Sequence, residues 1–212
     1  MSDKLSSLQV DSVIFDLDGT LWDNTRVEVK SYNEMIGDIR PEVTLDEVRA
    51  ILGLQHVQIG ERLFPMLDSE AAARMMQKCC DNECVLVKRE GGKIFDCVEM
   101  TLQKLSSKFS LHIVSNCQCG YIEAFLEFHG FSKYFSDFLC AGKSGFTKGE
   151  NIKMIIARNH LKSPVYVGDT QLDRDSAVFA GIPFIFASYG FGKVDSYDYE
   201  IHAPKELIDI LL

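Results

Sequence analysis

SVIFDLDGT, residues 12–20, ends a short apolar run on two aspartates and a glycine. The apolar residues predict a buried strand, and Asp16 and Asp18 then place two carboxylates, one residue apart, where that strand ends. Gly19 supplies the backbone freedom for a turn that swings the second carboxylate over the first. This stretch indicates a site that uses two acids, provided that other segments bring partners to it.

Similar apolar runs recur along the chain, and each ends in small or polar residues. The predicted strands cover residues 12–18, 110–116, 135–141, 164–169 and 183–188. Helix-like segments lie between them, at residues 95–108, 120–130, 149–161 and 171–181. Because the runs are continuously apolar rather than alternating, both faces of each strand are expected to be covered, as in a parallel sheet. The alternation of strands and helices predicts an α/β fold, a doubly wound parallel sheet of the Rossmann-like kind.

One long interval interrupts this alternation, between the first strand and the next core helix. Residues 24–93 are far more than a single crossover needs. The interval contains three further helix-like segments, at residues 26–39, 45–53 and 69–89. We therefore predict a helical cap domain at residues 24–90, inserted into a core domain made of residues 1–23 and 91–212. Gly91 and Gly92 give the junction the backbone freedom that a hinge uses.

Composition limits the classes of function. The chain has 212 residues, 46% of them hydrophobic and 25% charged, which is ordinary for a soluble globular protein. No apolar run reaches the ~20 residues that cross a bilayer, and the N-terminal segment lacks the apolar stretch of a signal peptide. We expect a cytoplasmic protein that binds no membrane, as a monomer or weak oligomer. The net charge of −9, without a basic run, argues against nucleic acid as a partner. The seven cysteines show no disulfide framework or zinc spacing and are expected to be buried packing residues.

The polar residues at the predicted strand ends converge on one crevice, because ligands of open α/β sheets bind beyond the carboxyl ends of the strands. These residues are Asp16, Asp18, Ser115, Asn116, Lys148, Asp169 and Asp173. Crowded carboxylates repel one another unless a cation lies among them, and Mg²⁺ prefers such oxygen ligands. A carboxylate can also attack phosphorus if a metal and a lysine neutralise the negative charge. A second carboxyl can protonate the leaving oxygen and then activate water.

Four of these segments together resemble the motifs of the haloacid dehalogenase-like hydrolases. They are DLDGT at 16–20, HIVSN at 112–116, TKGEN at 147–151 and GDTQLD at 168–173, and they occur in the family's order. The similarity extends from about residue 12 to residue 192 and is interrupted only by the cap. A helical cap between the first two motifs is similar to that of the phosphoglycolate phosphatase and β-phosphoglucomutase branch.

The resemblance implies a role for each matched residue. Asp16 would be the nucleophile, Asp18 the acid and base, and Lys148 the bridge between nucleophile and phosphoryl group. The dehalogenating branch lacks the second aspartate, so Asp18 favours phosphate transfer. The implied phosphate-binding residues are Thr20, Ser115 and Asn116. The implied Mg²⁺ ligands are Asp16, Asp18 through its backbone carbonyl, Asp169, and Asp173, which would alternatively orient the site.

One departure from the family concerns the third motif. Many relatives have Lys-Pro where this chain has Lys148-Gly149, and glycine does not fix the start of a helix as proline does. Lys143 lies nearby and is a competing candidate. We favour Lys148, since it directly opens the predicted helix.

Substrate specificity is expected on the cap. The resemblance points to the loop around Gly53, with Gln55 and His56 facing the substrate, while Arg26 and Arg49 are candidates for holding an anionic group. For each of these residues a solvated helix face is an equally good interpretation. The leading hypothesis is a Mg²⁺-dependent phosphatase of a small phosphorylated metabolite. The alternatives are a phosphomutase, whose second phosphate would need cap cations, and a non-catalytic phosphate-binding relative.

Overall fold

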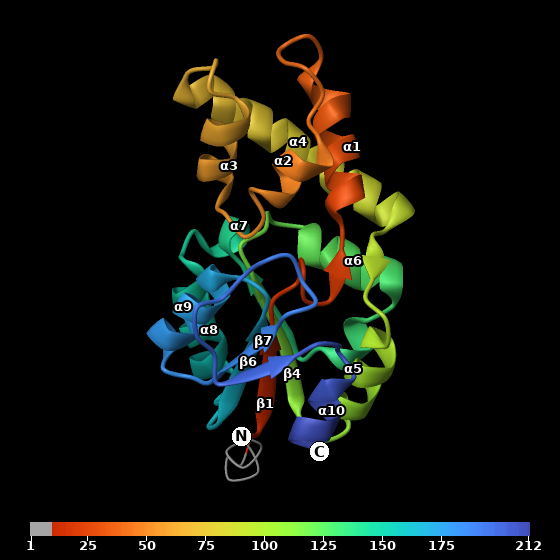
Figure 1. Cartoon of the computed structure of the whole chain (residues 1–212), viewed down its shortest axis with the longest axis vertical. Helices are drawn as coiled ribbons and strands as arrows, with labels where there is room; N and C mark the ends of the chain where they lie inside the picture. Colours follow the sequence, from red (N-terminus) through yellow and green to blue (C-terminus); the bar gives the residue numbers. More distant parts are fainter. Residues whose placement is uncertain (1–9) are drawn as a thin grey trace.

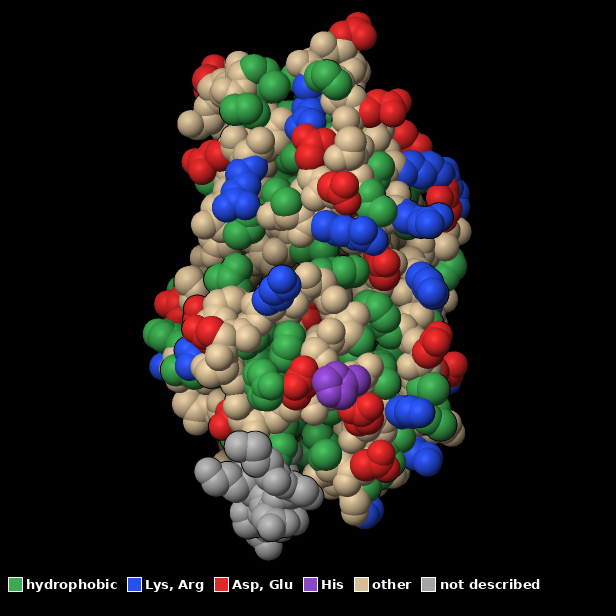
Figure 2. All heavy atoms as spheres, in the orientation of Figure 1, with side chains coloured by type: hydrophobic (Ala, Val, Ile, Leu, Met, Phe, Trp, Pro, Cys, Tyr) green, Lys and Arg blue, Asp and Glu red, His purple; other side chains and the backbone are tan. Residues whose placement is uncertain are grey.

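The structure, a computed structural model, describes residues 10–212, so the assignment of residues 1–9 to the core lies outside the described part. Figure 1 shows a sheet flanked by helices in the lower half of the molecule and a separate group of helices, α1–α4, above it. No helix in the described part of the chain is long and apolar enough to cross a bilayer. On the face shown in Figure 2, acidic and basic side chains are interspersed.

The main sheet has six strands in the order β5-β4-β1-β6-β7-β8, and every neighbouring pair is parallel. The strands are β1 (Ser12–Phe15), β4 (Ser110–Ser115), β5 (Asp137–Cys140), β6 (Pro164–Gly168), β7 (Phe184–Ala187) and β8 (Tyr199–Ile201). The predicted parallel sheet is confirmed, and β8 extends it beyond the expected strands. The strand β1 lies in the middle, between β4 and β6, so its carboxyl end is surrounded by the ends of both neighbours.

Helices cover both faces of this sheet. They are α5 (Val98–Ser106), α6 (Tyr121–His129), α7 (Ala141–Ser144), α8 (Lys148–Arg158), α9 (Gln171–Ala180) and α10 (Glu206–Leu211), with a 3₁₀ turn at Ser132–Tyr134. Alternate residues of β1 enter different hydrophobic clusters: Val13 and Phe15 pack with α5, α6 and α10, whereas Ile14 packs with α8 and α9. The fold is therefore the doubly wound α/β arrangement that the continuous apolar runs predict.

The upper group contains α1 (Thr25–Ile36), α2 (Leu45–Arg49), α3 (His56–Leu63) and α4 (Ser69–Glu90). These helices share a hydrophobic cluster whose buried members all lie between Tyr32 and Cys80. The packing supports an inserted cap, and its exact boundaries remain a prediction. The loop expected around Gly53 gives way to α3 at His56. A capping box between Gln55 and Gln58 starts a helix there, and its apolar face is buried.

A short antiparallel pair, β2 (Trp22–Asp23) and β3 (Lys93–Ile94), carries the chain between the two parts. Gly91 ends α4 with φ +63°, and a Cβ there would lie 2.1 Å from Phe128. At Gly92 a Cβ would lie 2.7 Å from Trp22. These two glycines therefore allow the junction to pack closely on the aromatic rings of Phe128 and Trp22. The hinge role stays a prediction.

All seven cysteines are free. Burial is confirmed for Cys79, Cys80, Cys117 and Cys140. The expectation of buried packing residues is wrong for two others, which lie exposed at the ends of helices or in loops: Cys97 and Cys119.

Candidate active site

The aspartate pair lies where β1 leaves the sheet. The backbone N–H of Asp16 donates to the carbonyl of Val167 at 2.8 Å, so the pairing with β6 continues past the last strand residue. Gly19 then turns the chain with φ +79°. A Cβ at Gly19 would lie 2.2 Å from Oδ2 of Asp169, so a glycine alone allows this turn to approach the carboxylate.

Lys148 enters the site from the first position of α8. A capping box between Thr147 and Glu150 fixes the start of that helix. The Nζ atom lies 2.9 Å from Oδ1 of Asp16 and 2.6 Å from Oδ1 of Asp173, and the lysine side chain is only 3% exposed. Burial alone would lower the pKa of Lys148, but the two carboxylates outweigh it and raise that pKa. The ammonium group is therefore charged and bridges the two acids.

Helix packing explains why glycine, rather than proline, follows Lys148 in this chain. A Cβ at Gly149 would lie 2.7 Å from the ring of Phe179, so glycine allows α8 to pack closely against α9. Helix α8 begins correctly without proline, because its capping box provides the start. The competing Lys143 is exposed on α7, with its amine 6.0 Å from the centre of the Phe138 ring.

Three carboxylates form a buried cluster. Asp16, Asp169 and Asp173 each offer an oxygen within 4.8 Å of the others. Oδ2 of Asp169 accepts from the backbone N–H groups of Phe191 (2.8 Å) and Gly192 (3.3 Å), whereas Oδ1 is buried without a partner. Burial and the nearby charge of Asp173 raise the pKa of Asp169 to about 7. A buried acceptor without a donor, beside two more carboxylates, fits a hard divalent cation such as Mg²⁺.

Asp18 has a different environment. Its Oδ1 accepts hydrogen bonds from Nε1 of Trp22 at 2.9 Å and from the hydroxyl of Tyr121 at 2.7 Å. Trp22 is fully buried and packs edge-on against Tyr121 and Phe125. The contact between the Trp22 and Tyr121 rings holds both hydrogen-bond donors in position beside Asp18. Burial raises the pKa of Asp18 to about 6, although both hydrogen bonds act to lower it. The carboxyl is thus held in one orientation with a pKa suited to proton transfer near neutral pH.

The predicted phosphate-binding residues separate into two groups. Ser115 and Asn116 line a cavity beside Asp16. The Oγ of Ser115 accepts from the N–H of Cys117 at 3.3 Å. Nδ2 of Asn116 donates to the carbonyl of Gly53 at 2.9 Å and so joins the end of β4 to the cap loop. Thr20 is fully buried outside the cavity lining, and its Oγ1 has no partner among the described residues.

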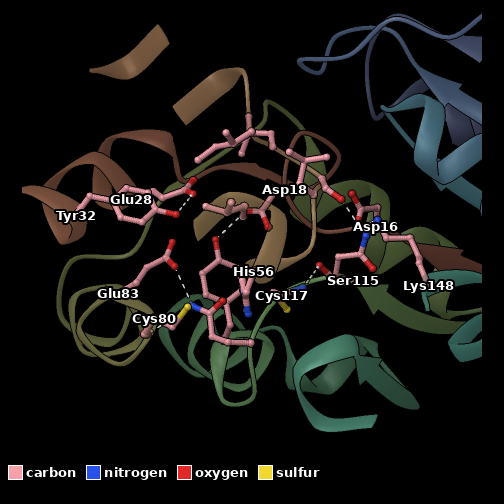
Figure 3. Close-up of a pocket in the computed structure, with 18 residues that line it drawn as sticks. Asp16, Asp18, Glu28, Tyr32, His56, Cys80, Glu83, Ser115, Cys117 and Lys148 are labelled. Atoms are coloured by element: carbon pink, nitrogen blue, oxygen red, sulfur yellow. Dashed lines mark hydrogen bonds and ion pairs between the residues drawn. The ribbon is translucent and has the colours of Figure 1, made fainter. Parts of the chain in front are cut away.

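That cavity lies between cap and core and has a volume of about 60 Å³. Figure 3 shows Asp16, Ser115 and Lys148 at one side of it, with Asp18 nearer the middle. Of the four cap residues expected at the substrate, only His56 lines the cavity. Gln55 is exposed as the N-cap of α3, and Arg26 and Arg49 are exposed away from the cavity.

The structure adds cavity residues that the sequence interpretation did not name. From the cap come Glu28 and Tyr32 of α1 and Glu83 of α4, and from the core come Gln118 and Tyr121. One of these residues, Glu83, could have been recognised from the sequence. Glu83 interrupts the apolar face of α4, whose buried residues otherwise recur at helical spacing. A lone carboxylate on such a face needs a buried partner or a ligand.

The family model of the haloacid dehalogenase-like hydrolases matches residues 13–187. The chain belongs to this family. The expected membership and the expected hydrolase class are confirmed, and the four motifs of the family are the segments that carry the carboxylates, Ser115 and Lys148 described above.

Among family members with curated names, the chain is similar to the phosphoglycolate phosphatase of Caulobacter vibrioides, with 25% identity over 98% of this chain and 94% of that protein. It is 27% identical to the phosphoglycolate phosphatase of Rhodobacter capsulatus, over 92% of this chain and 91% of that protein. The solved structure of a haloacid dehalogenase-like family hydrolase from Streptococcus pneumoniae has the same fold, with a TM-score of 0.84 at 18% identity. The superposition covers 96% of this chain and 99% of the Streptococcus pneumoniae protein.

Proposed function

We propose that this haloacid dehalogenase-like hydrolase is a Mg²⁺-dependent phosphatase that hydrolyses a small phosphorylated metabolite through an aspartyl-phosphate intermediate. The observation that carries the proposal is the buried contact of 2.9 Å between Nζ of Lys148 and Oδ1 of Asp16, beside two further carboxylates and a cavity. The names of the curated relatives support phosphate ester hydrolysis as the reaction.

The cation site would use side chains that already converge. Asp16, Asp169 and Asp173 would hold Mg²⁺, together with the backbone carbonyl of Asp18. The buried Oδ1 of Asp169, which has no donor, supports this assignment. When bound, the cation would neutralise negative charge on the phosphoryl oxygens and on the attacking carboxylate.

The chemistry divides between the two aspartates. A carboxylate oxygen of Asp16 attacks phosphorus, and the bond from phosphorus to the alcohol oxygen of the ester breaks. Asp18 donates its proton to that oxygen, so a neutral alcohol leaves. Asp18 then takes a proton from water, which attacks the phosphorus of the aspartyl phosphate and regenerates Asp16 with release of inorganic phosphate. Lys148 holds the nucleophile in place and supplies positive charge beside it.

The phosphomutase alternative requires positive charge on the cap to hold a second phosphate group. Arg26 and Arg49 were the candidates for that charge, and neither lines the cavity. A non-catalytic relative is a weaker alternative, because a residue of the matching type occupies every motif position. No observation favours either alternative over hydrolysis.

The test is release of inorganic phosphate from a panel of small phosphate monoesters and an activated aryl phosphate. Each assay is run with Mg²⁺ and with EDTA, for wild type, Asp16→Asn and the matched control Asp175→Asn. Asp175 is an exposed acid of α9. We expect metal-dependent release that Asp16→Asn abolishes and Asp175→Asn retains. Retained activity in Asp16→Asn would overturn the assignment of the nucleophile.

A further inference from the structure

Two glutamates occupy the cap side of the cavity, opposite the phosphoryl-transfer residues. Glu28 enters from α1 and Glu83 from α4, and Figure 3 shows both on the side away from Asp16 and Lys148. Glu83 is only 8% exposed. Neither glutamate forms an ion pair with any described residue. The cap therefore presents two carboxyl groups to whatever part of the substrate extends beyond the phosphate.

The hydrogen-bond donors around these glutamates are already committed. The hydroxyl of Tyr32 donates to Oε1 of Glu28 at 3.0 Å. Nδ2 of Asn24 donates to Oε1 of Glu83 at 2.9 Å, and Nε2 of Gln118 donates to Oε2 at 2.8 Å. Burial raises the pKa of both glutamates, and the nearby charge of Glu83 adds to the shift at Glu28. A positively charged occupant that donates hydrogen bonds would lower both pKa values and favour the ionised carboxylates.

A second observation, at Asn116, also indicates an occupant that donates hydrogen bonds. The Asn116 side chain is nine-tenths buried and lines the cavity, and its Oδ1 has no hydrogen-bond partner among the described residues. Its Nδ2 is held by the carbonyl of Gly53, so the amide is fixed with its oxygen as the spare group. A buried acceptor of this kind needs a donor from water or from a ligand.

Positive charge is scarce on the same lining. Among the described cavity residues, only Lys148 and His56 have side chains that can carry positive charge, and Lys148 is paired with Asp16 and Asp173. Burial lowers the pKa of His56, although a hydrogen bond with Gln118 acts against the shift. No unpaired cationic side chain among the described cavity residues is therefore positioned to hold an anionic leaving group. A charged occupant that suits two carboxyl groups carries positive charge.

We infer that Glu28 and Glu83 bind the ammonium group of the leaving alcohol, so that the preferred substrates are phosphate monoesters of short amino alcohols. This inference rests on the proposed phosphatase function. The cavity of about 60 Å³ has room for roughly five water molecules and would also have to hold the phosphoryl group, so it favours a short alcohol. The alcohol of phosphoglycolate has a similar size, but its carboxylate would lie against Glu28 and Glu83. The chain therefore differs in specificity from the activity named in its curated relatives.

Three esters of matched length separate charge from size: aminoethyl phosphate, hydroxyethyl phosphate and phosphoglycolate. The readout is kcat/KM for release of inorganic phosphate with Mg²⁺ at neutral pH. We expect the aminated ester to be preferred over the neutral ester by roughly 10- to 100-fold, the range of a charge-assisted hydrogen bond. Phosphoglycolate is expected to be the poorest of the three. Preference for the neutral or anionic ester would overturn the inference.

Substitutions assign the preference to named residues. Glu28→Gln and Glu83→Gln should each lower the ratio of kcat/KM for the aminated ester over the neutral ester by roughly 10-fold or more. Glu34→Gln makes the same charge change on the exposed side of α1 and should leave the ratio unchanged. A ratio that is unchanged in both cavity variants would contradict the assignment, whatever their stability, because the ratio cancels a loss of folded enzyme.

A binding measurement keeps the two proposals distinguishable. Calorimetry with Asp16→Asn compares the dissociation constants of aminoethyl phosphate and hydroxyethyl phosphate without turnover. Tighter binding of the aminated ester, together with no hydrolysis of any ester by the wild type, would support the ammonium site and refute the phosphatase. Hydrolysis without preference for the aminated ester in either assay would refute the ammonium site alone.

Discussion

Replacing Lys148 by methionine tests whether the bridging ammonium group organises the carboxylate cluster. The lysine is 3% exposed and contacts Asp16 at 2.9 Å and Asp173 at 2.6 Å. Methionine fills a similar volume but leaves both carboxylates, and Asp169 beside them, without the cation. Removing one partner of a buried ion pair destabilises a protein by about 3–5 kcal/mol.

The expected loss is large enough to measure by thermal unfolding. For a chain of this size, each kcal/mol lowers Tm by about 2–4 °C, so Lys148→Met should melt about 6–20 °C below the wild type in EDTA. Mg²⁺ should restore part of the loss, because a ligand present at a hundred times its Kd stabilises the folded state by about 2.7 kcal/mol. The measurement is circular dichroism melting of both proteins, with and without Mg²⁺.

Lys143→Met is the matched control, since Lys143 is an exposed lysine on the neighbouring helix α7. It should melt within about 1–2 °C of the wild type, as surface substitutions usually change stability by less than about 0.5 kcal/mol. Equal melting temperatures for the two variants would refute the bridging role. A Lys148→Met loss that Mg²⁺ leaves unchanged would refute the proposed cation site, but not the ion pair.

Three further predictions concern residues around this cluster. Tyr121→Phe removes a donor from Asp18 and should lower kcat by roughly 10-fold or more in steady-state assays; an unchanged kcat would contradict the orienting role. Gly19→Ala should destabilise the fold more than Gly37→Ala in melting experiments, since both have positive φ but only the Cβ at Gly19 meets a carboxylate; equal losses would refute the close approach. Burial raises the pKa of Glu83 from 4.5 to about 8, so the folded state holds a proton that the unfolded state has lost between these values. Between pH 4.5 and 8, the unfolding free energy of the wild type should therefore fall as the pH rises, relative to that of Glu83→Gln, measured by urea denaturation; parallel pH profiles would contradict the shift.

The sequence predicts the core well, because each motif follows an apolar run and the carboxyl ends of parallel strands meet at one edge of the sheet. That geometry alone brings Asp16, Lys148 and Asp173 together across 132 and 25 residues of sequence. The short elements α10 and β8 were missed, since a few apolar residues give no clear period.

The cap side of the site is harder to predict. Which residues of a helix face the substrate depends on how the cap is docked on the core, and no local pattern encodes that rotation. Arg26 and Arg49 were therefore candidates for contacting the substrate, but both are exposed. The residues of the same cap that line the cavity include Glu28 and Glu83 instead. Tyr121 lies 103 residues from the Asp18 that it contacts, and nothing in its own segment distinguishes it from an ordinary packing residue.

The proposed mechanism requires a covalent bond between a carboxylate oxygen of Asp16 and phosphorus. Asp18→Asn should trap this species, because the variant lacks the base that activates water, while an aryl phosphate supplies a leaving group that needs no proton. The measurement is intact-protein mass spectrometry after rapid acid quench, with peptide mapping of the modified residue. We expect one added phosphoryl group on Asp16 of Asp18→Asn and none in the double variant that carries both Asp16→Asn and Asp18→Asn. An unmodified Asp16 in a protein that still hydrolyses the aryl phosphate would contradict it.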